Sequence, residues 1–148
     1  MARIDFAFGA PDRLRMACDV IRKHHMAGRP LMVYSRNEGR LKQFDRLLWS
    51  FEPVAFIPHV DVTDALAQVT PVLFTTSPPS PEQHAQHAHA AVWLINLDDD
   101  IPATASQFER IIEIVDHQPD EVQAGRQRWR AYKEAGHDVR AHDVSARR

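Results

Sequence analysis

Apolar residues along the chain fall into two patterns, one with the spacing of strands and one with that of helices. Residues 2–8 alternate, with Ile4, Phe6 and Phe8 on one side, which predicts an opening strand. Uninterrupted apolar runs elsewhere are typical of strands covered on both faces of a sheet. The later predicted strands span residues 31–34, 54–57, 72–76 and 91–95.

Four segments carry apolar residues at helical spacing behind a residue that typically starts a helix. Thr104 and Gln107 form a capping box in front of Phe108, Ile111, Ile112 and Val115, which predicts a helix there. Gly28 and Gly136 predict the ends of the first and last helices. The four helices are predicted to begin at Asp12, Asn37, Thr104 and Pro119.

Strands that alternate with helices imply an α/β fold with a mostly parallel sheet flanked by helices. No internal repeat and no long linker divides the chain, so residues 1–148 are predicted to form one domain. Residues 77–90 are polar, with three prolines and three histidines, and are predicted to form an exposed loop. The polar residues 137–148 after Gly136 are predicted to be a loosely held tail.

Composition excludes several classes of protein. The chain has 148 residues, of which 44% are apolar and 26% charged, close to globular averages. The single cysteine, Cys18, excludes a disulfide framework and a cysteine-rich zinc site. A net charge of −2 offers no general attraction to nucleic acid or anionic lipid. Without a signal-like N-terminus or a membrane-length apolar run, a soluble cytoplasmic protein is expected.

The glycines exclude the common nucleotide-binding loops. The five glycines stand at positions 9, 28, 39, 125 and 136, and no two of them are close. A phosphate-cradling loop needs clustered glycines that let backbone N–H groups approach the anion, so no such loop and no cofactor is expected. His84, His87 and His89 are expected to bind metal only adventitiously, because they lack a fourth ligand and a rigid frame.

The last predicted helix carries the most unusual cluster. Arg126, Arg128, Arg130 and Lys133 occur without an intervening acid. Arg126, Arg130 and Lys133 share one helix face, with Trp129 beside them, although like charges at this spacing slightly destabilise a helix. Two interpretations stand. The cations form a solvated face with Trp129 in the core, or they form a platform for an acidic peptide.

A second aromatic cluster follows the second predicted helix. Trp49 and Phe56, taken alone, are more typical of a core than of a site. His59 follows a proline at a strand end but has no neighbouring nucleophile or carboxylate in the sequence, so no catalytic residue is assigned.

In their order and spacing, these clusters resemble the chi subunit of bacterial DNA polymerase III holoenzyme. The resemblance covers nearly the whole chain. Its motifs are Leu48–Trp49, Phe56–His59, the strand entry Pro71–Val72, and the run from Arg126 through Arg128, Trp129, Arg130, Tyr132 and Lys133 to Gly136.

The resemblance implies a Rossmann-like fold that does not bind a nucleotide, and a non-catalytic accessory subunit of the clamp-loader complex. Such a subunit pairs with the psi subunit and binds the acidic C-terminal tail of single-stranded DNA-binding protein (SSB), which ends in Ile-Pro-Phe. Little or no direct nucleic-acid binding is expected. The alternative is an α/β enzyme acting on a small nucleotide or phosphoester, because such folds host many chemistries.

The resemblance also implies which residues bind the SSB tail. Basic contacts fall on Arg126 and Arg130, with Lys133 on the same face, and the aromatic platform falls on Trp129. The pocket for the terminal phenylalanine involves Val115 and Trp129, with Trp49 and Phe56 as further walls and Gly136 fixing the turn beyond. Asp98–Pro102 reads like the tip of that tail; it is either a polar loop or an internal mimic.

Overall fold

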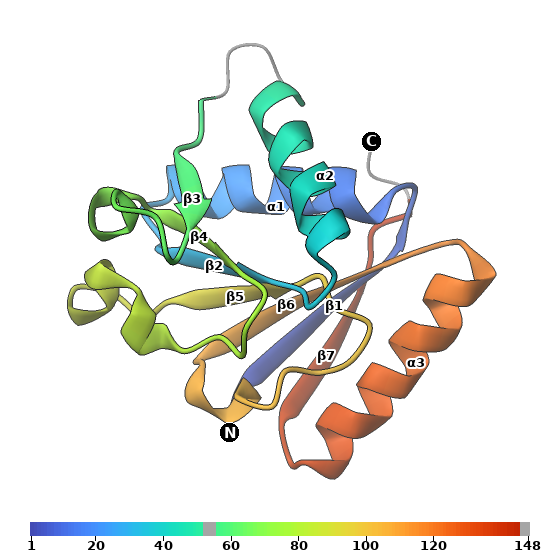
Figure 1. The fold of residues 1–148 in the computed structure, drawn as a ribbon. Coiled ribbons are helices and arrows are strands. Elements are labelled where there is room, and N and C mark those ends of the chain that lie inside the picture. Colours follow the sequence, from blue (N-terminus) through green and yellow to red (C-terminus); the bar gives the residue numbers. More distant parts are fainter. Residues whose placement is uncertain (52–55, 146–148) are drawn as a thin grey trace.

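The computed structural model describes residues 1–51 and 56–145 (Figure 1). Within them, seven strands form one sheet in the order β3-β4-β2-β5-β6-β1-β7, and every neighbouring pair is parallel. The fold class is therefore α/β, as predicted. The strands are β1 (Arg3–Ala10), β2 (Leu31–Tyr34), β3 (His59–Asp61), β4 (Val72–Thr75), β5 (Trp93–Asn96), β6 (Arg110–Asp116) and β7 (Asp138–Asp143).

Helices cover both faces of the sheet. α1 (Arg13–Met26) and α2 (Glu38–Ser50) lie on one face and α3 (Pro119–Glu134) lies on the other (Figure 1). Each face has its own apolar core: Ile21 and Phe44 belong to one, Tyr132 and Phe108 to the other. Short 3₁₀ helices span Ala67–Val69, Pro81–Gln83, Ala85–Ala88 and Ala105–Gln107 in the described chain.

The predicted helix starts at Asp12 and Asn37 are confirmed. The Asp12 carboxylate accepts a hydrogen bond from Arg15 N at 3.0 Å, and the Asn37 side-chain oxygen accepts one from Arg40 N at 3.0 Å. Gly28 and Gly136 follow α1 and α3 with φ of +85° and +87°, which only glycine adopts freely.

The predicted helix behind Thr104 is wrong, because Arg110–Asp116 is the strand β6. Ile111, Ile112 and Val115 do fit a helical spacing, but Glu113 and Ile114 between them are equally buried. A strand covered on both faces buries every residue, so its apolar residues form an unbroken run. A short unbroken run also contains apolar residues three and four positions apart, which is the spacing expected of a helix. β6 lies between β5 and β1, where both of its faces are covered.

Two further predictions need correction around β3 and β4. Residues 54 and 55 of the strand predicted at 54–57 lie outside the described residues, and Phe56 and Ile57 are not in a strand; β3 begins at His59. The segment 77–90 is not simply an exposed loop. It contains two 3₁₀ helices, and His84 is buried with its Nε2–H donating to Pro71 O at 2.9 Å.

The predicted loose tail is also wrong for residues Asp138–Asp143, which form the edge strand β7. They pair in parallel with β1 from Arg3 to Phe8. The sequence of β7 is polar because an edge strand needs few apolar residues, so its composition resembled that of a tail. This strand completes one wall of the site described next.

Candidate functional site: a groove beside α3

A groove of about 470 Å³ lies between α3 and the strands β1, β6 and β7; we call it the α3 groove. Its lining is mostly apolar, with Arg126 at the rim and Asp116 and His117 where β6 ends. Alternation along β1 directs Phe6 and Phe8 to this side of the sheet. The main apolar lining residues are Phe6, Phe8, Val115, Val122, Trp129 and Ala141.

Trp129 is half-buried in this groove, so it is neither enclosed in the core nor fully exposed on the helix surface. Its ring meets Phe6 edge-on, with centroids 5.2 Å apart and planes at 60°. Lys133 Nζ lies 5.4 Å from the centroid of the indole ring. Trp129 thus packs on the core with one side and lines the groove with another, beside an ammonium group that favours an aromatic face.

Gly125 lets α3 approach β6 closely at the floor of the groove. A Cβ at this position would lie 2.7 Å from Val115 Cγ2, closer than two carbon atoms can pack. The depth of the groove therefore depends on a glycine inside a helix, where glycine is otherwise unfavourable.

A buried polar network fixes α3 to β6 beneath the groove. The carboxylate of Glu113 on β6 accepts hydrogen bonds from Arg128 Nε at 2.9 Å, Tyr132 Oη at 2.6 Å and Asn96 Nδ2 at 2.7 Å. Arg128, Glu113 and Tyr132 are almost fully buried. Charge-assisted hydrogen bonds of this kind are short and strong, so they set the orientation of α3.

The network neutralises one of the four cations in the α3 cluster. Burial alone would lower the pKa of Arg128, but the adjacent Glu113 carboxylate raises it above its ordinary value. Burial and the same carboxylate raise the pKa of Tyr132 well above its ordinary value, so its hydroxyl stays protonated. Arg126, Arg130 and Lys133 are exposed on α3 and form no ion pair with any other residue that the structure describes.

The structure brings together only part of the predicted site. Val115, Arg126 and Trp129 line the groove. Arg130 and Lys133 lie on exposed positions of α3 outside the lining, and Gly136 is in the turn after the helix, where it was predicted.

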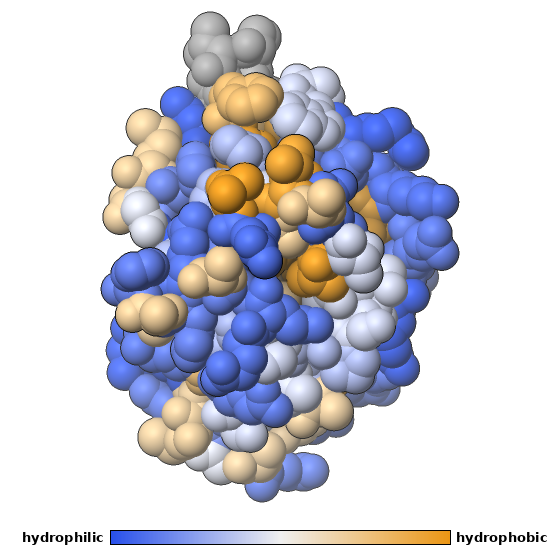
Figure 2. Space-filling model, turned by 60° about the vertical axis from the view of Figure 1, so that its left-hand side comes forward, coloured by the Kyte–Doolittle hydropathy of each residue, from blue (hydrophilic) through white to orange (hydrophobic). Residues whose placement is uncertain are grey.

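The prediction that Trp49 and Phe56 form further walls of this pocket is wrong, because neither lines the α3 groove. Trp49 is in the last turn of α2 and Phe56 lies just before β3, the edge strand farthest from β1 and β7. They form a separate aromatic patch, with ring centroids 5.2 Å apart. Figure 2 shows hydrophobic residues gathered on the side of the molecule that carries β3 and β4.

The aromatic patch rests on His59, the side chain of which is buried. The His59 ring lies 4.4 Å from Trp49 and 5.3 Å from Phe74, and its Nε2 is 2.8 Å from a carboxylate oxygen of Asp45 on α2. His59 Nδ1 contacts Ile57 O at 2.7 Å. These contacts tie β3 to α2 and support the two exposed rings.

The acidic loop after β5 contacts Arg36, which precedes α2, and Arg40 in the first turn of α2, rather than the exposed cations of α3. Asp98 forms a two-pronged ion pair with Arg36, with its Oδ2 3.1 Å from Nε and 2.9 Å from Nη2. Asp99 pairs with Arg40 at 3.1 Å and Asp100 with Arg36 at 2.6 Å. In this structure, therefore, the three loop carboxylates do not occupy the rim of the α3 groove.

Sequence reasoning missed the contributions of Phe6, Phe8 and Ala141 to the groove. The alternation of residues 2–8 already placed Phe6 and Phe8 on one side of a strand, but not beside Trp129. Nothing in the polar sequence of β7 pointed to Ala141, because only the pairing of β7 with β1 brings it there.

Residues 1–51 and 56–145 contain no group of three or more His, Cys, Asp or Glu side chains arranged to hold a metal ion. None of the helices described is both long and apolar enough to span a bilayer.

Comparison with known proteins points to one family. The family model described as "DNA polymerase III chi subunit, HolC" matches residues 1–140. A protein of Pseudomonas aeruginosa named DNA polymerase III subunit chi is 30% identical over 146 residues, covering 96% of each chain. A protein of the same name from Haemophilus influenzae is 22% identical over 129 residues, covering 87% of this chain and 85% of its own.

Proposed function

Since this chain belongs to the DNA polymerase III chi subunit family, we propose that its α3 groove binds the acidic C-terminal tail of SSB. The observation that carries this proposal is an apolar groove beside exposed cations of α3, none of which forms an ion pair within residues 1–51 and 56–145. Family membership makes the chain an accessory subunit of the polymerase holoenzyme. The tail would link that assembly to DNA coated with SSB.

The chemistry of the groove suits a peptide that ends in proline and phenylalanine. The groove volume of about 470 Å³ accommodates both side chains, and Trp129 and Phe6 offer aromatic surface to the terminal ring. Arg126 at the rim presents a guanidinium fork to the terminal carboxylate. Arg130 and Lys133 lie farther along α3, where they meet the preceding aspartates.

The balance of these contacts predicts an affinity in the micromolar range. A few charge-assisted contacts of about 1 kcal/mol each add to one buried aromatic ring, and ordering a flexible tail offsets part of that gain. Because Arg128 is bound to Glu113, only three cations of α3 contribute to tail binding.

We assign the pairing with psi to the aromatic patch. Trp49 is 47% exposed and Phe56 is 70% exposed, and large exposed aromatic residues supported from below are typical of interface hot spots. The patch lies at the sheet edge opposite the groove, so psi and the SSB tail can bind at the same time. Both roles are non-catalytic and are expected in the cytoplasm.

A crossed binding experiment tests both assignments. Fluorescence polarisation measures binding of a labelled peptide ending in Asp-Asp-Asp-Ile-Pro-Phe, and capture by purified psi measures the second contact. Trp129→Ala, or deletion of the terminal phenylalanine, weakens peptide binding by about tenfold or more. Trp49→Ala leaves peptide binding unchanged and abolishes psi capture.

Each variant serves as the control for the other, since each removes one tryptophan from a different surface. Unchanged peptide affinity in both Trp129→Ala and Arg126→Glu would show that the tail does not bind in the α3 groove. Normal capture of psi by Trp49→Ala and by Phe56→Ala would remove the aromatic patch from the psi contact.

A further inference from the structure

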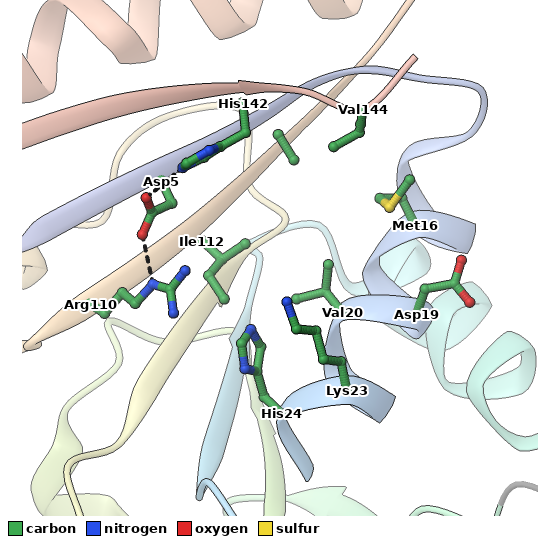
Figure 3. A pocket seen from close by; sticks show the side chains of 11 residues that line it. Asp5, Met16, Asp19, Val20, Lys23, His24, Arg110, Ile112, His142 and Val144 are labelled. Carbon is green, nitrogen blue, oxygen red and sulfur yellow. Dashed lines mark hydrogen bonds and ion pairs between the residues drawn. The ribbon is translucent and has the colours of Figure 1, made fainter. Parts of the chain in front are cut away.

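A second hollow, of about 380 Å³, lies on the face of the sheet opposite the α3 groove (Figure 3). We call it the α1 hollow, because among the described helices only α1 lines it. Alternation along β1 puts Asp5 and Ala7 on this side, whereas Phe6 and Phe8 face α3. The floor is apolar and consists of Ala7, Met16, Val20, Ile112 and Val144.

Cationic and imidazole groups from two elements converge on one end of the α1 hollow. Figure 3 shows Lys23 and His24 of α1 reaching toward the space that also faces Arg110 of β6. Asp19 lies at the other end, beside Met16. In residues 1–51 and 56–145, the side chain of Lys23 forms neither an ion pair nor a hydrogen bond, and the terminal nitrogens of Arg110 donate to no group.

Arg110 is held in place while its terminal nitrogens stay available. Its Nε donates to Asp5 Oδ2 at 2.6 Å, and its guanidinium lies 4.4 Å from the centroid of the Trp93 ring. Asp5 is almost fully buried and already contacts Arg3 at 2.9 Å and His142 at 2.9 Å. Because Asp5 pairs with both Arg3 and Arg110, its single negative charge does not balance the two guanidinium groups.

The pKa of His24 is consistent with an excess of positive charge at this end of the hollow. Burial, followed by the positive charges of Arg110, Lys23 and Arg29, lowers the pKa of His24 to about 4. His24 is therefore neutral near pH 7, and the groups around it disfavour a further positive charge. An anion placed here would meet the Lys23 ammonium group, the terminal nitrogens of Arg110 and a neutral imidazole.

We propose that the α1 hollow binds a small organic phosphate, with the phosphate held by Lys23, Arg110 and His24 and the organic part on the apolar floor. An ammonium group, a guanidinium and an imidazole from separate positions match three phosphate oxygens, whereas a carboxylate offers only two. The volume is within the range of small-molecule sites. This site differs from the usual nucleotide position of α/β folds, which lies at the carboxyl ends of the strands.

The three tryptophans of the chain make the proposal testable by NMR, because each lies at a different surface. Trp93 is beside the α1 hollow through its contact with Arg110, Trp129 lines the α3 groove, and Trp49 is in the aromatic patch. Titration with phenyl phosphate shifts the Trp93 indole N–H signal saturably and leaves the other two in place. Lys23→Gln weakens this binding about tenfold, the effect of one lost charge-assisted contact.

Lys42→Gln is the matched control, because Lys42 is also an exposed helix lysine but pairs with Glu38 on α2. It leaves phenyl phosphate binding unchanged. Three results overturn the proposal: no saturable shift of Trp93, equal weakening by both lysine variants, or equal affinity for benzoate. A shift of Trp93 by the SSB-tail peptide instead of by phenyl phosphate would assign the hollow to the peptide and overturn the phosphate site.

Discussion

The α3 groove and the aromatic patch both present tryptophan at the surface, but their surroundings differ. Trp129 is half-buried in a concave apolar groove and lies next to Lys133, with Arg126 at the rim. Trp49 is almost half exposed and, with Phe56, rests on the buried ring of His59 beside the Asp45 carboxylate. The first surface favours a negatively charged chain end; the second favours an apolar partner.

The two surfaces are also supported by different forces. Trp129 is positioned by a helix that a buried ion pair fixes to the central strand β6. Trp49 is in the last turn of α2, next to the three-residue edge strand β3. The difference implies that damage to the core under α3 affects tail binding and leaves the aromatic patch in place.

The largest expected effect comes from Glu113→Gln, which removes the charge that compensates buried Arg128. Leaving a buried cation without its partner costs about 3–5 kcal/mol of the free energy of unfolding, measured by urea denaturation. Glu38→Gln, which breaks only the exposed pair with Lys42, is the control and costs at most about 0.5 kcal/mol. Equal losses in the two variants would show that the network does not hold α3.

Replacing Gly125 by alanine tests the close approach of α3 to β6. The new Cβ collides with Val115, so α3 shifts outward and the groove changes shape. The net loss of stability is about 1–2 kcal/mol, because overpacking outweighs the gain in helix propensity, and peptide affinity falls several-fold. In the control, Gly39→Ala, the nearest atom is 3.5 Å away, and stability rises by up to about 1 kcal/mol.

The smallest expected effect is the salt dependence of binding, which differs between the two surfaces. Raising NaCl from about 50 mM to about 500 mM weakens peptide binding several-fold, because exposed charges on Arg126, Arg130 and Lys133 are screened. Psi capture by the aromatic patch changes little, since apolar contacts are not screened. Fluorescence polarisation and psi capture, repeated at each salt concentration, check this difference. Salt-independent peptide binding would mean that the cations of α3 take no part.

Much of the fold followed from local patterns in the sequence. Asp12 and Asn37 were correctly predicted as helix starts, and residues 31–34 were predicted as β2 with its observed bounds. β6 was mistaken for a helix because an apolar run buried on both faces satisfies either periodicity. β7 was mistaken for a tail because an edge strand can remain polar.

By itself, the sequence determined the α/β class, the lack of clustered glycines and the presence of tryptophan among cations on the last helix. These features depend on neighbours within one or two turns of the chain. Only the tertiary structure decided that Arg128 is buried in an ion pair while its neighbours on α3 are exposed, because the partner of Arg128 is on another element. It also separated Trp49 and Phe56 from Trp129, since the order of strands sets which distant segments meet, and local spacing carries no information about that order.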